Sequence, residues 1–259
     1  MISCVLQGGL GNQMFQIAAT VGTSLKYGIP YGIDLNNCYT PNQGFTANKY
    51  SETIFKNIKT VENQNHKIVY NESKFSFGEI PNQNELLIKG YFQSEKYFLE
   101  HKNEIKNLFY ISEEDKTIVN NFFKDEKIEG KKTCIHIRRG DYLKYSDFHN
   151  VCNLDYYLKA ISTIGDGSFI FVSDDIKWVK ENFKSENYYF ADFNNEILDF
   201  TLITMCDNVV ISNSSFSWWG SYLNNNENKT IIAPYKWFGS QGPKDTQDIY
   251  NKEWVVIDF

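Results

Sequence analysis

Arg138 and Arg139 stand side by side and are the only arginines in the chain. Of its 26 lysines and arginines, the other 24 are lysine. Lysine serves on most solvated faces, but it lacks the planar fork that grips two oxygens at once. The pair follows residues 134–137, which read as a short buried strand, and ligands of open α/β sheets bind just beyond such strand ends. These residues predict a phosphate or pyrophosphate site; the alternative is a pair of surface arginines bonded to nearby carboxylates.

Polar side chains also follow two other candidate strands in this half of the chain. Asp174 comes after the apolar residues 168–172, and could accept from a base or ribose or simply cap the next helix. Residues 212–217 place four serine hydroxyls at a strand-to-helix turn, a pattern that suits phosphate and equally suits an ordinary N-cap. His136 points to the opposite face of its strand from Ile135 and Ile137. It could contact the base of a nucleotide, or it could be a core histidine whose hydrogen bonds are satisfied. Together, three strand ends facing one crevice predict a nucleotide diphosphate site.

The elements that must position these groups alternate strand and helix. Such alternation predicts a parallel sheet with right-handed crossovers. The predicted strands cover residues 134–137, 168–172, 188–190, 208–211 and 230–233. The predicted helices cover residues 113–123, 155–164, 178–183, 196–205 and 218–223.

The first half opens with a strand at residues 2–7, a glycine turn that includes Gly11, and an apolar helical stripe from Met14 to Leu25. This unit brings backbone amides and a helix N-terminus close to an anion or a sugar. A dinucleotide fingerprint would need glycine where Met14 stands, so an NAD-dependent enzyme is kept only as an alternative. A second strand at residues 85–91 precedes Ser94, which could cap a helix running to Leu108.

The charged, glycine-containing residues 124–132 predict a boundary between two lobes. We expect an N-terminal lobe at residues 1–128 and a C-terminal lobe at residues 129–259.

Composition excludes several classes of protein. A net charge of −6 and a pI near 5.3 argue against a nucleic-acid groove or a polybasic membrane patch. The five scattered cysteines, odd in number and without a Cys-x-x-Cys pair, suggest neither a disulfide framework nor a zinc site. The first residues lack the features of a secretory signal, and no window approaches 18 apolar residues. We therefore expect a cytoplasmic protein, which could still associate with a membrane at its surface. The absence of an Asp-x-Asp pair predicts that no metal is used, with Arg138 neutralising the leaving group instead.

Five motifs, which together run in order over nearly the whole chain, resemble those of the bacterial α-1,2-fucosyltransferases of glycosyltransferase family 11. They are residues 8–16 (GGLGNQMFQ), 90–98 (GYFQSEKYF), 136–142 (HIRRGDY), 173–175 (SDD) and 212–220 (SNSSFSWWG). The resemblance implies an α/β protein of GT-B type, with two Rossmann-like lobes and a cleft between them. It also implies GDP-L-fucose as donor, a galactose-terminated oligosaccharide or lipid-linked glycan as acceptor, and metal-free inversion to an α-1,2 linkage. By the same resemblance the N-terminal lobe would be the acceptor side and the C-terminal lobe would bind the nucleotide sugar.

The resemblance also implies roles for single residues. Arg138, with Arg139 beside it, would hold the β-phosphate, and His136 and Asp174 the guanine side. Ser214, Ser215, Phe216 and Ser217 would bind the phosphates. Asn12, next to Gly11 in the glycine turn, would lie beside the reacting centre.

A base for the acceptor hydroxyl is proposed at Glu95 from its position after a strand, while the nearby Asp141 is expected to orient an arginine. A loose transition state would need little help from a base. A different deoxysugar donor, a different acceptor, or a carbohydrate-binding protein without catalysis remain the other readings.

Overall fold

The computed structural model describes residues 1–39, 44–62 and 66–259, which form two compact units. The first unit comprises Met1–Ile111 and Pro243–Asn251. The second comprises Ser112–Gly242 and Lys252–Phe259. The polypeptide therefore passes between the units more than once.

The second unit is built on a six-stranded sheet in which every strand pair is parallel. Its order is β11-β10-β9-β6-β7-β8, so the chain runs outward from β6 to one edge, returns to β9, and runs to the other edge. This is the 3-2-1-4-5-6 order of dinucleotide-binding sheets, whose strand order reverses between the first and fourth strands, here β6 and β9. The strands are β6 (Lys132–Ile137), β7 (Ser168–Ser173), β8 (Tyr188–Phe190), β9 (Asn208–Val210), β10 (Ile231–Pro234) and β11 (Val255–Ile257).

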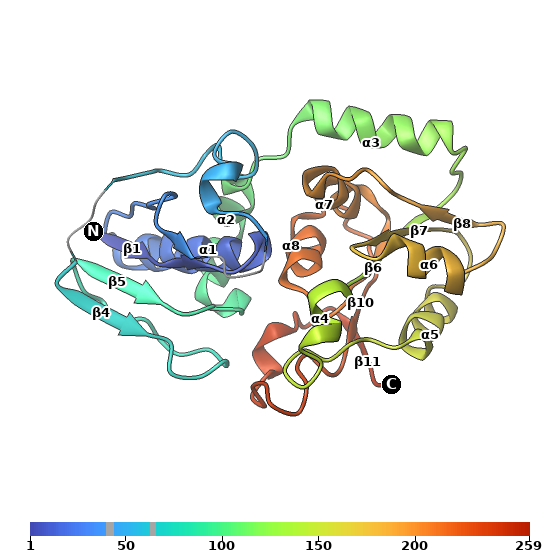
Figure 1. The fold of residues 1–259 in the computed structure, drawn as a ribbon. Helices are drawn as coiled ribbons and strands as arrows, with labels where there is room; N and C mark the ends of the chain where they lie inside the picture. The colour runs from blue at the N-terminus through green and yellow to red at the C-terminus, as the bar shows by residue number, and fades with distance from the viewer. Residues whose placement is uncertain (40–43, 63–65) are drawn as a thin grey trace. The chain divides into compact units, whose positions relative to one another are not determined.

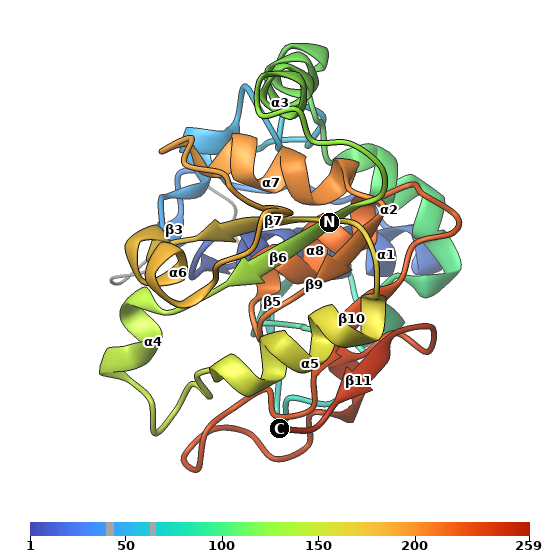
Figure 2. The ribbon, with the colours of Figure 1, turned by 90° about the vertical axis from the view of Figure 1, so that its right-hand side faces the viewer.

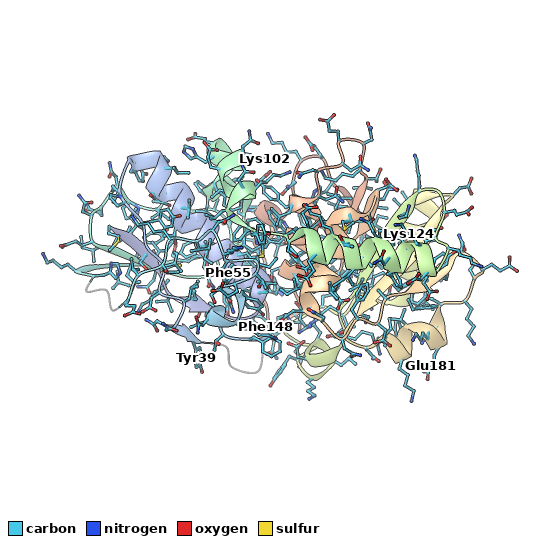
Figure 3. All side chains as sticks on the ribbon, turned by 90° about the horizontal axis from the view of Figure 1, so that it is seen from above. Tyr39, Phe55, Lys102, Lys124, Phe148 and Glu181 are labelled. Carbon is cyan, nitrogen blue, oxygen red and sulfur yellow. The ribbon has the colours of Figure 1, made fainter. Side chains whose placement is uncertain are left out.

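Helices cover both faces of this sheet (Figures 1 and 2). Helices α5 (Leu154–Ile164) and α6 (Ile176–Asn182) pack on the face that carries Ile135 and Phe171. Helices α7 (Glu196–Met205) and α8 (Ser215–Leu223) pack on the other face, which carries His136, and α3 (Glu113–Asp125) lies against α7. Because helices cover both faces, the central strands β6 and β7 are buried along nearly their whole length, as expected for a parallel sheet. Lys124 of α3 and Glu181 of α6 extend from this unit into solvent (Figure 3).

The first unit has a smaller parallel sheet, in the order β1-β5-β4, and a separate pair of strands, β2 and β3. Helix α1 (Leu10–Tyr27) is buried along most of its length and ends at Gly28, whose φ of 66° is the left-handed conformation that suits glycine. Phe55 lies in the interior of this unit (Figure 3). The strands are β1 (Ile2–Cys4), β2 (Leu6–Gln7), β3 (Cys38–Tyr39), β4 (Ile68–Asn71) and β5 (Leu86–Lys89).

Two predicted elements of the first unit are broken in the structure. The strand expected at residues 2–7 divides at Val5, because β1 pairs with β5 while β2 pairs with β3. The helix expected after Ser94 becomes two short 3₁₀ helices, Glu95–Tyr97 and Leu99–His101, followed by α2 (Lys102–Leu108). Phe98 interrupts the helix with a φ of −145° while its side chain is buried.

The division into units also differs from the predicted lobes at residues 1–128 and 129–259. Helix α3 belongs with the second unit because it packs on α7, so the first crossing lies before Ser112. Near the C-terminus, Pro243–Asn251 returns to the first unit, where Asp245 and Asp248 accept from the backbone amides of Ser76 and Phe77 at 3.0 and 2.9 Å. The charged, glycine-containing residues 124–132 join the end of α3 to the start of β6.

The contact between α1 and the broken segment yields a stability prediction. A Cβ on Gly22 would lie 2.5 Å from the Tyr97 carbonyl oxygen and 3.0 Å from the Phe98 Cα. Alanine favours a helix interior over glycine by about 1 kcal/mol, but overpacking against backbone costs about 1–3 kcal/mol. We expect Gly22→Ala to lower the free energy of unfolding in urea, whereas Leu25→Ala, at a side chain that is 41% exposed, leaves it nearly unchanged. A more stable Gly22→Ala variant would contradict this packing.

Candidate nucleotide-sugar site

The site of the second unit is built where the strand order reverses, at the ends of β6 and β9. His136, near the end of β6, shares a hydrogen bond of 2.9 Å between its Nδ1 and the Ser212 hydroxyl, which follows β9. Beyond this contact the chain continues into different helices, α4 (Gly140–Lys144) after β6 and α8 after β9. Such a switch point is where open α/β sheets bind ligands.

The imidazole of His136 is buried and uncharged. Only 5% of the residue is exposed, and its ring lies 5.6 Å from the ring of Phe216 on α8. Burial, assisted by the nearby charge of Arg138, lowers the pKa of His136 to about 3. Near neutral pH His136 is therefore a hydrogen-bonding group that links the turn after β9 to β6.

Arg138 is held by two carboxylates and remains partly exposed. Its Nη2 donates to Asp141 at 2.6 Å, and its Nη1 lies 3.1 Å from Asp174. Burial alone would lower the pKa of Arg138, but the two carboxylates outweigh burial and raise it, so its charge is permanent. A guanidinium has five N–H donors, and the side chain is 31% exposed, so donors remain for a bound anion.

Arg139 has a different environment from its neighbour. Its Nε donates to Asp175 at 3.1 Å, and its guanidinium lies 3.7 Å from the centre of the Trp178 ring. Only 16% of the side chain is exposed. These contacts attach the turn after β6 to the start of α6.

Asp174 orients the turn after β6 and does not cap α6. Its Oδ1 accepts from the Arg139 backbone N–H at 2.9 Å, while its Oδ2 faces Arg138. Glycine at position 140 permits this approach, because a Cβ there would lie 2.6 Å from Asp174 Oδ2 and the carboxylate would have to shift. The cap of α6 is supplied by Asp175, whose Oδ1 accepts from the Trp178 N–H at 3.3 Å.

The serine turn, residues 212–217, supplies the N-cap of α8 and contacts His136 of β6 through Ser212. Ser214 caps α8 by accepting from the Phe216 N–H at 3.3 Å, and the buried Ser217 hydroxyl donates back to the Ser214 carbonyl at 3.3 Å. Ser215 and Phe216 are half-buried at the start of the helix. The ordinary-cap reading is therefore confirmed for Ser214, and the turn presents the amino end of α8 at the switch point.

Sequence reasoning missed Asn213, which joins three loops. Its buried side-chain amide donates at 2.7 Å to the carbonyls of both Asn150 and Trp237. Its own carbonyl accepts from the Tyr142 hydroxyl at 3.1 Å. The Tyr142 ring also stacks on His149, with centroids 4.1 Å apart and planes 7° from parallel. None of these partners is near in sequence, so only the surplus of polar residues in 212–217 could have pointed to Asn213.

The remaining predicted residues lie in the first unit. Asn12 is half-buried in the first turn of α1, and Gly11 is buried beside it. Gly8 has a φ of 76°, and a Cβ there would lie 2.5 Å from the Asn12 Nδ2, so the side chain of Asn12 occupies the space that the glycine leaves. Glu95 is half-buried and begins the first 3₁₀ helix, with Ser94 as the predicted cap accepting from the Lys96 N–H at 3.2 Å.

Two other features are absent from the described part of the chain. No group of three or more His, Cys, Asp or Glu side chains there is arranged to hold a metal ion. No helix among residues 1–39, 44–62 and 66–259 has the length and apolar character needed to cross a membrane. All five cysteines are free thiols.

Sequence comparison identifies the family. The model of "Glycosyl transferase family 11" matches residues 1–258. The chain belongs to glycosyltransferase family 11. It is 31% identical to the O-antigen biosynthesis glycosyltransferase WbnK of Escherichia coli, over 99% of this chain and 100% of WbnK. It is 30% identical to an α-1,2-colitosyltransferase of E. coli, over 98% of this chain and 97% of the relative. A galactoside 2-α-L-fucosyltransferase of Caenorhabditis elegans is 27% identical, over 100% of this chain and 77% of that protein.

Solved structures agree with the fold of this family 11 enzyme. The Bradyrhizobium α-1,6-fucosyltransferase NodZ, soaked with GDP-fucose, gives a TM-score of 0.54 at 12% identity, over 86% of this chain and 92% of NodZ. POFUT1 in complex with GDP-fucose gives 0.51 at 11% identity, over 99% of this chain and 96% of POFUT1. At these identities the likeness shows a shared α/β fold with parallel sheets.

The buried His136 predicts how this family 11 enzyme responds to acid. Its pKa is 6.5 when unfolded and about 3 when folded, so the unfolded chain takes up a proton that the folded one refuses. The neutral His136 makes its full contribution to the stability of the fold above pH 6.5. That contribution is lost as the pH falls toward 3. Between pH 7 and pH 5 we expect the free energy of unfolding of the wild type to fall by about 2 kcal/mol more than that of His136→Asn, measured by urea unfolding at each pH. Parallel pH profiles for the two proteins would show that His136 titrates normally in the fold.

Proposed function

We propose that this chain is an inverting galactoside α-1,2-fucosyltransferase. In this proposal it moves L-fucose from GDP-β-L-fucose to the 2-hydroxyl of a terminal galactose, without a metal ion. The acceptor is an oligosaccharide or a lipid-linked glycan, nucleic acid takes no part, and the location is cytoplasmic. Family membership and the fucosyltransferase among the relatives support the reaction class. The observation that carries the proposal is Arg138, a permanently charged guanidinium held by two carboxylates at the switch point.

The chemistry follows from the stereochemistry of the donor. A β-linked donor gives an α product when the acceptor oxygen attacks from the opposite face in one displacement. Negative charge then grows on the β-phosphate as the sugar bond breaks. A preorganised donor aimed at such a charge contributes roughly 3–4 kcal/mol, which is about 10²- to 10³-fold in rate. Arg138 is placed in that role because its partners fix its direction before the charge develops.

The other groups of the second unit support this assignment in distinct ways. Ser214, Ser215, Phe216 and Ser217 would offer hydroxyls and the amino end of α8 to the phosphates. His136 and Asp174 are assigned to the guanine side of the nucleotide. Their contacts with Ser212 and with the turn after β6 favour a further, positioning contribution, since each holds a segment of the site. Arg139 would act on the nucleotide chiefly by fixing the backbone beside Arg138.

We assign the acceptor side to the first unit. Asn12, with the adjacent Gly11 amide, is proposed to lie beside the reacting centre. Glu95 is proposed as the base that takes the proton of the acceptor hydroxyl. The sequence motifs at residues 8–16 and 90–98 support both assignments.

A second donor is a specific alternative. The α-1,2-colitosyltransferase is nearly as similar to this chain as the O-antigen glycosyltransferase WbnK, at 30% and 31% identity. A related deoxysugar such as colitose would then replace fucose in the same displacement. Product linkage analysis with GDP-fucose and a panel of β-galactosides decides between them. An α-1,2-fucosylated product supports the proposal, and turnover of GDP-colitose with no turnover of GDP-fucose would replace it.

The two adjacent arginines allow a matched test of the phosphate site. We expect Arg138→Lys to lower kcat by about 10²- to 10³-fold, because a lysine cannot keep both carboxylate contacts and a fork toward phosphate. Arg139→Lys removes a ring contact and a carboxylate bond that serve the fold, so it should lower the thermal midpoint more than it lowers turnover. The measurements are steady-state kinetics with GDP-fucose and the thermal shift produced by GDP. Full activity of Arg138→Lys would overturn its central role.

The proposed base has its own test. If Glu95 takes the acceptor proton, Glu95→Gln should lower kcat by at least about 10²-fold while GDP binding is kept. Glu100→Gln, an exposed position in the next 3₁₀ helix, is the matched control. Turnover near normal in Glu95→Gln would exclude Glu95 as the base.

A further inference from the structure

A partly buried hydrogen bond joins two distant motifs within the first unit. The Gln93 Nε2 donates to the Asn12 Oδ1 at 2.7 Å, across 81 positions of sequence. Gln93 is 7% exposed, whereas Asn12 is half-buried. From Leu10 to Ser24, Asn12 is the one residue of α1 that is not buried. We propose that Gln93 is a positioning residue that fixes the orientation of the Asn12 amide. This inference rests on the proposed function, in which Asn12 acts beside the reacting centre.

The bond sets the orientation of the Asn12 amide, because the Oδ1 of Asn12 accepts from the Gln93 Nε2. The Nδ2 of Asn12 lies over the Cα of Gly8, where a Cβ would come within 2.5 Å of it. The turn below it is itself fixed, because the Gln13 Nε2 donates at 2.8 Å to the carbonyl of Gly8. The amide and the glycine turn are therefore held in one arrangement.

The backbone that delivers Gln93 is held in an unfavourable conformation. Phe92 has a φ of 51°, in the left-handed region that a bulky side chain rarely adopts, although its ring is fully buried. Strained backbone of this kind persists only where its surroundings enforce it, and it gathers at functional sites.

Glu72 enforces that conformation. Its two carboxylate oxygens accept from the backbone N–H groups of Tyr91 and Phe92, at 2.7 and 3.0 Å. Glu72 follows β4, its own N–H donates to the Lys89 carbonyl at 2.8 Å, and position 90 must be glycine because a Cβ there would collide with the Glu72 side chain. The Glu72 carboxylate therefore holds the chain that follows β5 against the end of β4. Gln93 is the next residue after this held segment.

Stability alone does not account for this arrangement. Among the described residues, no hydrogen-bond donor reaches the buried Gln93 Oε1. A buried acceptor without a partner is costly, and so is the left-handed Phe92. An apolar side chain at position 93 would avoid the first cost. Both costs are compatible with a segment whose purpose is to place one N–H donor on Asn12.

A double-mutant cycle tests whether Gln93 acts through Asn12. Gln93→Glu replaces the donor with an acceptor at nearly constant size, and we expect kcat to fall by about 10²-fold while the GDP-induced thermal shift is unchanged. In an Asn12→Ala background the same substitution should have no further effect on kcat. Equal losses in both backgrounds, or wild-type kcat in Gln93→Glu, would overturn the proposal. Gln16→Met is the matched control, since Gln16 is a buried glutamine of α1 that bonds to Gln7 instead; its effect should add to that of Asn12→Ala.

A second measurement does not depend on turnover. The side-chain amide resonances of Asn12 in an NMR spectrum should shift in Gln93→Met, which keeps the size of the side chain and removes the donor. Unchanged resonances in a folded Gln93→Met protein would overturn the proposal. If the wild type transfers no fucose, the proposed function fails, and the Asn12 resonances still decide whether Gln93 positions that amide.

Discussion

The ion pairs of Arg138 with Asp141 and Asp174 are the constraint on which the candidate site depends. Asp141 lies one turn away on α4, and Asp174 comes from the end of the neighbouring strand β7. A guanidinium on a free loop would lose side-chain entropy whenever it bound an anion. Held from two directions, Arg138 has lost that freedom on folding, and its charge is fixed by the same carboxylates. The fold thereby bears the cost of ordering before any ligand arrives.

The parallel sheet explains why these groups can meet. Six strands running the same way bring all their carboxyl ends to one edge, and the reversal of strand order between β6 and β9 separates the helices that follow them. His136 and Ser212 then touch across the switch point, although 76 positions separate them. The strand order therefore determines where these groups meet.

Much of the second unit was predictable because its signals are local. Strands such as β8 and helices such as α7 have the predicted bounds, since apolar runs and helical periodicity depend on near neighbours. The order of the strands was not predictable, because it depends on which buried faces pair across the whole chain. For the same reason, the alternative in which Asp174 caps α6 was wrong. Asp174 accepts from the Arg139 backbone N–H instead, and Asp175 caps α6.

The first unit was less predictable, since tertiary contacts override local preference there. The sequence after Ser94 favours one continuous helix, yet Tyr97 and Phe98 are both buried, and the helix breaks at Phe98. Gln93 and Asn213 were missed for a related reason. Their partners lie far away in sequence, and an amide in a polar stretch looks the same whether it is solvated or buried.

The distribution of polar side chains follows one rule of desolvation. Among the residues that the structure describes, the buried polar side chains are amides, hydroxyls and one neutral histidine; Asp, Glu, Lys and Arg are absent from that set. An amide can cross-link loops in the interior at the cost of a neutral hydrogen bond, whereas a buried charge needs a full set of partners. Charges appear where water still reaches, as at Arg138 and its carboxylates. The chain thus uses carboxamides to fix its loops, whereas the charge of Arg138 lies where water still reaches it.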